Sequence, residues 1–127
     1  MDPQTILTHY DQGHLWTEAP SREANVGMPA AYQSSLAVRD LRIARGEIPR
    51  GFKIGFTNRN IWPRYNVYAP IWGTVYDTTL SFCDGQGTIS LASSRQPRIE
   101  PEAVFGMKSA PAPDASLDDL FDPIFLC

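Results

Sequence analysis

Two glutamates, Glu100 and Glu102, are the residues of this chain whose type and spacing best suit chemistry. The residues around them alternate, which is the period of a β-strand with one buried face. Residues two apart on a strand project to the same side, so both carboxylates should point together. Hard divalent cations such as Mg²⁺ take oxygen ligands of this kind. The residues that would share the opposite, buried face are Ile99, Pro101, Ala103, Phe105 and Met107.

The same spacing also fits the solvated polar face of an ordinary amphipathic strand, because Glu-x-Glu is a short and common motif. Two adjacent carboxylates repel each other unless solvent or a cation lies between them. Pro101 biases Glu100 towards an extended conformation and indicates an edge strand or a bulge. Spacing by itself favours the solvated face, and only a longer pattern favours a metal site.

A longer pattern is present. The run Gln96–Met107, which reads QPRIEPEAVFGM, resembles the metal-binding strand of the 2-keto-4-pentenoate hydratases, a family of the fumarylacetoacetate hydrolase superfamily. The run Gly51–Asn58, GFKIGFTN, is similar to the Lys-Ile-Gly strand of that family. The resemblance extends from the helix near Pro29 to about Asp122, and its order and spacing are more specific than any one motif. Three further segments resemble one branch of these hydratases: Ile61–Tyr65, Ala69–Gly73 and Val75–Thr79.

The resemblance implies an α+β fold, with N-terminal helices followed by part of a mixed β-roll or sandwich of the fumarylacetoacetate hydrolase type. It implies that Glu100 and Glu102 bind Mg²⁺ or Mn²⁺ together with a third carboxylate. In the family that ligand lies further along than Cys127, and the pattern departs after Asp122. We therefore expect an N-terminal portion of the fold, truncated before the strands that close the β-roll.

The activity implied is that of a hydro-lyase of aromatic catabolism, which adds water to 2-hydroxypenta-2,4-dienoate (2-keto-4-pentenoate) to give 4-hydroxy-2-oxopentanoate. A divalent cation would stabilise the negative charge on the substrate oxygen during ketonisation. Related 2-oxo acid decarboxylases and acylpyruvate hydrolases share the same carboxylates, so they remain alternatives. A third alternative is a non-catalytic remnant or partner subunit. The expected partners are the small 2-oxo or 2-hydroxy-dienoic acid, and either further copies of the chain or a full-length homologue.

Lys53 matches the strand lysine of the family, which implies a catalytic role as a fixed positive charge near the substrate carboxylate or dienolate. The alternative is a surface lysine on the polar face of a strand. A Schiff-base nucleophile is less favoured, because a metal already supplies the electrophile. Arg98 suits a clamp on the substrate carboxylate and equally suits a solvated arginine at a strand end.

Length and composition set the remaining expectations. The chain has 127 residues, 43% hydrophobic and 20% charged, with a formal net charge of -3. This predicts one globular domain, helical over 1–50, β-rich over 51–109, and ending in a linker and divergent tail over 110–127. Without a dense Lys/Arg run, a signal peptide or an apolar span, we expect no nucleic-acid or membrane partner and a cytoplasmic location. Cys83 and Cys127 should be free thiols.

Capping residues and periodicity predict three helices. Asp2 and Gly13 bound a helix over Pro3–Gln12, and a second helix runs from after Pro29 to a stop at Gly46. Ser116 caps a short helix over Leu117–Phe121. Residues 17–29 should form a loop.

Alternation predicts a strand that begins at Phe52 and continues to Thr57, and a second strand over Val75–Phe82. A turn at Asp84–Gly87 should lead into a strand over Thr88–Ala92, and a further strand is expected over Arg98–Met107. Phe52, Ile54 and Phe56 should be buried, with Lys53 on the opposite face and pointing into the same cleft as Glu100 and Glu102. The loop 58–73 carries aromatic residues that suit a pocket wall or the core: Trp62, Tyr65, Tyr68 and Trp72.

Overall fold

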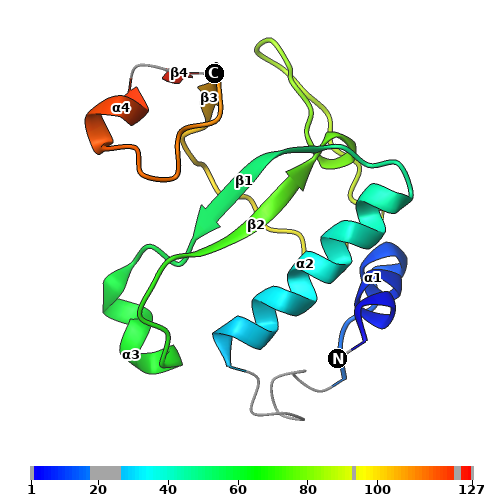
Figure 1. Ribbon diagram of the computed structural model, residues 1–127. Helices are drawn as coiled ribbons and strands as arrows, with labels where there is room; N and C mark the ends of the chain where they lie inside the picture. The colour runs from blue at the N-terminus through cyan, green and yellow to red at the C-terminus, as the bar shows by residue number, and fades with distance from the viewer. Residues whose placement is uncertain (1, 18–26, 93, 122–123, 127) are drawn as a thin grey trace. The chain divides into compact units, whose positions relative to one another are not determined.

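The computed structural model describes residues 2–17, 27–92, 94–121 and 124–126, and these form a mixed α+β structure (Figure 1). The chain divides into two compact units, Met1–Arg95 and Gln96–Cys127, and each is described by itself. Over the described ranges, every helix is too short or too polar to cross a lipid bilayer.

Helix α1 spans Pro3–Gln12, as its capping residues predict. The carboxylate of Asp2 accepts a hydrogen bond of 2.9 Å from the backbone amide of Thr5, which satisfies one of the unpaired N–H groups of the first turn. Gly13 ends the helix in the left-handed conformation at φ 61°, and its amide donates to the carbonyl of Tyr10.

Helix α2 spans Met28–Ala44 and packs beside α1 (Figure 1). It begins with Pro29 in its first turn and ends before Gly46, at φ 102°, where the Gly46 amide donates to the carbonyl of Ile43 at 2.9 Å. The prediction of this helix is confirmed. The predicted loop 17–29 falls mostly on residues 18–26, which lie outside the described residues.

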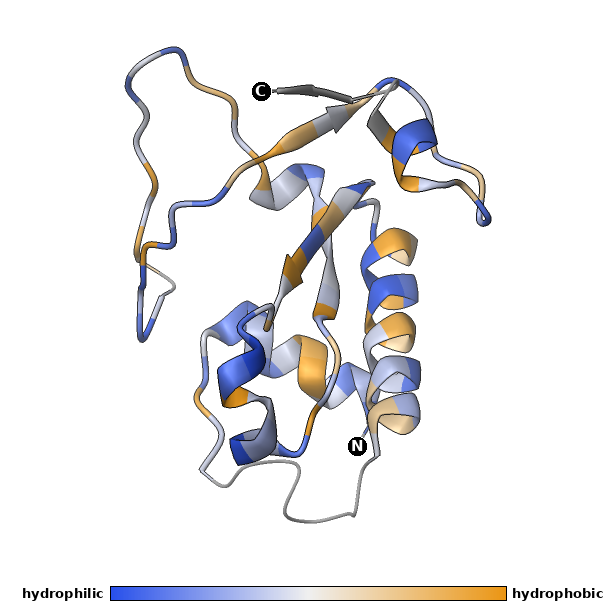
Figure 2. Cartoon of the chain, turned by 90° about the vertical axis from the view of Figure 1, so that its left-hand side faces the viewer, coloured by the Kyte–Doolittle hydropathy of each residue, from blue (hydrophilic) through white to orange (hydrophobic). Residues whose placement is uncertain are grey.

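A two-stranded antiparallel sheet follows, formed by β1 (Pro49–Gly55) and β2 (Ile71–Tyr76). The extra residue of a bulge lies between Pro49 and Gly51. The long connection between the strands contains η2 (Arg59–Ile61) and α3 (Trp62–Tyr65), and β2 is followed by η3 (Asp77–Thr79). The hydropathy of these strands and of the helices beside them is shown in Figure 2.

The connection turns at Phe56, which has a positive φ of 58° and closes β1. A bulky residue in this region is strained, so something must hold it there. The indole nitrogen of Trp62 donates a 2.8 Å hydrogen bond to the carbonyl of Phe56, and the ring of Tyr65 lies edge-to-face against the Phe56 ring at 5.6 Å. These two contacts hold the turn.

The second unit contains β3 (Phe105–Met107), paired antiparallel with β4 (Ile124–Leu126), and α4 (Leu117–Phe121). The hydroxyl of Ser116 accepts from the Asp119 amide, and the Ser116 amide donates to the Asp119 carboxylate at 2.9 Å. This reciprocal pair is a capping box, so the predicted helix and its cap are confirmed. Strand β4 was not expected from the sequence.

The buried core is small. Among the described residues, the buried apolar side chains are Leu7 and Tyr76. Phe52 and Ile54 are 59% and 58% exposed, so the prediction that they lie on a buried face is wrong. The alternation of the strand is real, but Tyr32 of α2 contacts this face at Trp72 and leaves Phe52 and Ile54 more than half exposed.

Three predicted strands are wrong in whole or in part. Residues 88–92 form no strand, and of the segments Val75–Phe82 and Arg98–Met107 only Val75–Tyr76 and Phe105–Met107 are in strands. The turn at Asp84–Gly87 is present as a bend with Gly85 at φ 77°, but strands do not flank it. Alternation specifies which side chains share a face, whereas a strand also needs a partner for its backbone groups.

Candidate functional site

Glu100 and Glu102 lie in an irregular exposed segment that precedes β3. The expectation that they share the face of a strand is therefore wrong, because strand pairing begins only at Phe105. The apolar residues that alternate with them were predicted to be buried, and this is also wrong, since Ile99 is 93% exposed. Both carboxylates are exposed side chains next to Pro101, which has no amide hydrogen to donate to a ladder.

Lys53 lies at the middle of β1, directly opposite Gly73 on β2. Residues directly opposite each other in an antiparallel pair project to the same face, so the neighbour of Lys53 across the sheet has no side chain. Phe52 and Ile54 point to the other face, as alternation predicts. The Lys53 side chain is exposed.

Arg98 lies in the same irregular segment as the two glutamates and is exposed. It lies two residues before Glu100 and four before Glu102 in the sequence, whereas Lys53 belongs to the other unit. The proximity of Lys53 to Glu100 and Glu102 stays a prediction, as does the clamp role of Arg98.

A metal centre built from this chain would rest on Glu100 and Glu102. In the described parts of the chain, no three His, Cys, Asp or Glu side chains are grouped in a way that suits a metal ion. Asp77, which follows β2, serves the backbone: its carboxylate oxygen accepts from the amides of Ile48 and Thr78 at 2.9 Å each. Asp77 is therefore a fixed part of the strand end.

A charged cluster that sequence reasoning missed lies where α2 meets β1. We call it the Glu47 corner, and it comprises Glu47, Arg42, Arg45, Asp11 and Thr78. Arg42 makes two hydrogen bonds to the Glu47 carboxylate, at 2.7 and 2.9 Å, and both residues are buried. Arg45 bridges Glu47 at 2.9 Å and Asp11 at 2.6 Å, and the hydroxyl of Thr78 donates to Glu47.

The guanidinium of Arg42 also lies between two aromatic rings. Its central carbon is 3.8 Å from the centroid of Tyr76 and 4.8 Å from that of Tyr10. The Arg42 hydrogen bonds, then those from Thr78 and Arg45, lower the pKa of Glu47 from 4.5 to about 2 against the opposing effect of burial. The hydrogen bonds to Asp11 and Glu47 raise the pKa of Arg45.

The Glu47 corner therefore joins α1, the end of α2 and the end of β2 through one carboxylate whose acceptor sites are all engaged. Its chemistry is structural, since the pKa of Glu47 lies far below that of a general acid or base at neutral pH. Its signal in the sequence is Arg42 and Glu47 on either side of the Gly46 helix stop, a pairing that only the turn geometry brings together.

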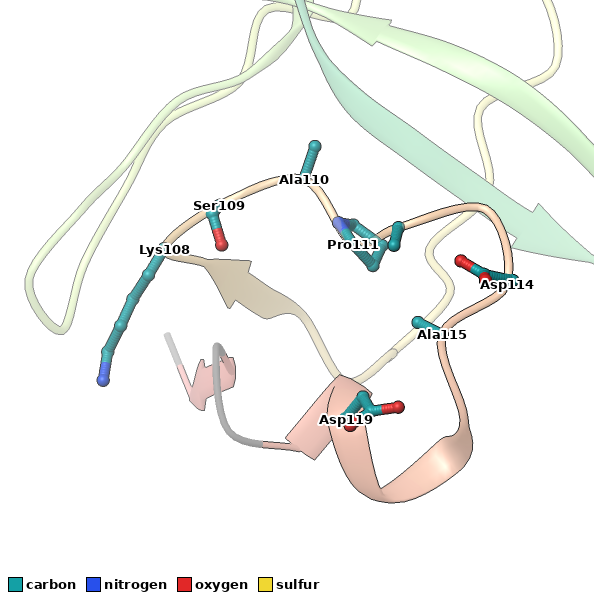
Figure 3. A pocket seen from close by; sticks show the side chains of 8 residues that line it. Lys108, Ser109, Ala110, Pro111, Asp114, Ala115 and Asp119 are labelled. Atoms are coloured by element: carbon teal, nitrogen blue, oxygen red, sulfur yellow. The ribbon is translucent and has the colours of Figure 1, made fainter.

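A surface hollow of about 570 Å³ lies in the second unit (Figure 3). It contains one cation, Lys108, and two carboxylates, of which that of Asp119 is engaged by Ser116. None of the residues predicted to act in the site lines this hollow. Its lining is Lys108, Ser109, Ala110, Pro111, Ala112, Asp114, Ala115 and Asp119.

In comparisons with known proteins, no family model, no curated protein and no solved structure matches the chain.

Proposed function

We propose that this chain carries part of the active site of a metal-dependent hydro-lyase similar to the 2-keto-4-pentenoate hydratases. The reaction is the addition of water to 2-hydroxypenta-2,4-dienoate to give 4-hydroxy-2-oxopentanoate. The observation that carries the proposal is the ordered pair of motifs, with Lys53 in Gly51–Asn58 and Glu100 and Glu102 in Gln96–Met107.

The described geometry supports the proposal at Lys53. Lys53 lies in the middle of a strand opposite Gly73, where no atom lies within 4 Å of the position that a Cβ would occupy. The ammonium of Lys53 would hold the substrate carboxylate there as a charge-assisted hydrogen bond. The proposed part of the fold, a β-roll of the fumarylacetoacetate hydrolase type, would include β1 and β2.

The donor set at Glu100 and Glu102 suits Mg²⁺ or Mn²⁺, because both are hard cations that bind carboxylate oxygen. Two carboxylates would fill part of an octahedral shell, and the exposed position of both leaves room for water and for substrate oxygens. When bound, the ion would supply Lewis-acid stabilisation of the negative charge on the substrate oxygen. The two glutamates would hold the ion, and Lys53 would orient the substrate.

The test is metal binding by the whole chain, measured by titration calorimetry with Mn²⁺ and with Mg²⁺. The double variant E100Q/E102Q keeps the shape of both side chains and removes both charges, so we expect it to abolish binding. The matched control is Asp114→Asn, an exposed carboxylate of the same unit. Equal binding by the wild type and E100Q/E102Q would overturn the metal site.

The reaction is tested by the disappearance of the conjugated dienoate absorbance, with E100Q/E102Q and Lys53→Met as variants. Turnover by the wild type that both variants lose supports the proposal. Turnover of a 2-oxo-hexenedioate with release of CO₂, or cleavage of an acylpyruvate, would assign the same residues to a related decarboxylase or hydrolase instead. Binding of metal with no turnover of any of these acids would leave a metal-binding, non-catalytic partner as the function.

A further inference from the structure

The segment that contains Lys53 also carries charged and aromatic residues that the proposed reaction does not use. From Ile48 to Tyr76 the sequence contains four cations and neither Asp nor Glu, although the whole chain has a net charge of -3. This stretch is the β1–β2 hairpin with its helical connection. The cations are Arg50, Lys53, Arg59 and Arg64.

One face of the hairpin is apolar and exposed. Ile54 lies opposite Trp72, and Phe52 is on the same face two residues earlier. The ring of Phe52 meets that of Trp72 edge-on at 5.3 Å, and Tyr32 of α2 stacks on Trp72 at 5.1 Å. The Tyr32 hydroxyl also accepts from the Trp72 amide at 3.2 Å, so the Trp72 ring is held in place while Phe52 and Ile54 remain more than half exposed.

The connection between the strands adds cations that are set against aromatic rings. Arg59 lies 5.7 Å from the centroid of Trp62, and Arg64 lies 5.7 Å from that of Tyr65. Neither arginine forms an ion pair with the described residues. Tyr65 and Tyr68 are 57% and 63% exposed. A guanidinium beside a ring can still bind a carboxylate with two hydrogen bonds.

Exposed Trp, Tyr, Phe and Arg without Asp or Glu are the composition of the centre of a protein–protein interface. The charge decides which partner fits. Two copies of the chain that met through this surface would bring Arg59 and Arg64 of one copy against the same two cations of the other, which repel. A small acid is disfavoured because the apolar face is a strand surface and small ligands bind in concave sites.

We propose that the hairpin surface, defined by Phe52, Ile54, Trp72, Arg59, Arg64, Tyr65 and Tyr68, docks an acidic segment of a partner protein that also carries apolar side chains. The carboxylates of the partner pair with Arg59 and Arg64, and its apolar side chains cover Phe52 and Ile54. Single-stranded nucleic acid meets the charge requirement but leaves the aliphatic Ile54 without a function, since bases stack on aromatic rings.

The experiment measures the binding of the full chain to a fluorescein-labelled peptide in which glutamate alternates with valine, by fluorescence anisotropy. We expect R59E/R64E to weaken binding at least about tenfold, because each reversal replaces an attraction by a repulsion. We expect F52S/I54S to weaken it by a similar factor. The control K108E reverses an exposed cation outside the hairpin and should leave affinity within about twofold.

Three further probes make the result decisive: the same peptide with lysine for glutamate, oligoglutamate, and oligothymidine. The proposal requires that the glutamate–valine peptide binds most tightly and that its affinity falls with salt. Tighter binding of oligothymidine would assign the surface to nucleic acid. Equal affinity for oligoglutamate would show that Phe52 and Ile54 do not contribute to binding. An absence of peptide binding, or an equal loss in K108E, would overturn the proposal.

Discussion

The carboxylate of Glu47 and the carboxylates of Glu100 and Glu102 occupy contrasting surroundings. Glu47 is buried, receives hydrogen bonds from Arg42, Arg45 and Thr78, and lies where two helices and a strand end meet. Glu100 and Glu102 are exposed on a segment that has neither helical nor strand structure. The first carboxylate is buried in a network of hydrogen bonds, and the other two are exposed on an irregular segment.

The comparison separates stability from chemistry. A buried carboxylate that loses its donors is left as an uncompensated charge, so its removal should affect folding. An exposed carboxylate keeps its hydration, which leaves it able to exchange water for a cation. Stability measurements should therefore respond to changes at the Glu47 corner, and metal binding should respond to changes at Glu100 and Glu102.

The largest expected effect is that of Glu47→Gln. The change leaves the buried guanidinium of Arg42 facing a neutral amide, and breaking a buried pair in this way costs about 3 kcal/mol of unfolding free energy. The measurement is urea denaturation of the wild type and variant at neutral pH. Asp114→Asn, which neutralises an exposed carboxylate, is the control and should change stability by less than about 0.5 kcal/mol. Similar stabilities for the wild type and Glu47→Gln would show that Glu47 contributes no more to folding than an exposed carboxylate does.

The same carboxylate should give the wild type an acid-dependent loss of stability. The pKa of Glu47 is about 2 in the folded chain against its ordinary value of 4.5. Between these values the unfolded chain binds the extra proton, so the stabilisation is present above about pH 4.5 and is lost as the pH falls towards 2. We expect about 2 kcal/mol of this loss to be absent from Glu47→Gln, as measured by denaturation across this range. Parallel pH profiles for the two proteins would contradict the pairing.

Gly46→Ala tests the turn that brings Glu47 back to Arg42. Gly46 has φ 102° and open space around its Cα, so an added methyl group meets no atom within 4 Å and only the backbone conformation is strained. We expect a loss of about 1 kcal/mol in thermal or urea denaturation. Gly51→Ala is the matched control, because Gly51 also has open space but no positive φ. An equal effect of both changes would show that the positive φ of Gly46 does not account for the loss of stability.

The smallest expected effect is that of Ile54→Ser. Because Ile54 is 58% exposed, its replacement should alter the unfolding free energy by less than about 0.5 kcal/mol. Tyr76→Leu, at a buried position against Arg42, provides the contrasting case and should cost more. A loss of 2 kcal/mol or more on Ile54→Ser would show that the face of β1 is covered after all.

Local signals predicted the helices well. Asp2, Gly13, Gly46 and Ser116 each act on backbone groups within a few residues, so their effect does not depend on the remainder of the fold. The strand β1 and the turn at Asp84–Gly87 were also found, although the turn is not flanked by strands. Alternation over-predicted strands at Thr88–Ala92 and Arg98–Val104, because the pattern of side chains contains no information about the partner strand.

The sequence by itself determined where helices α1, α2 and α4 begin and end, that Lys53 lies on the opposite face from Phe52 and Ile54, and which residue types could bind a cation or an anionic substrate. Those properties follow from capping, from the strand period and from side-chain chemistry, which act over short distances along the chain. Only the tertiary structure decided that Glu47 joins Arg42, Arg45 and Thr78, that Phe52 and Ile54 are exposed, and that Glu100 and Glu102 precede a strand. These outcomes depend on which distant segments meet, and the free energy of such contacts is set by burial and partner geometry that no single segment contains.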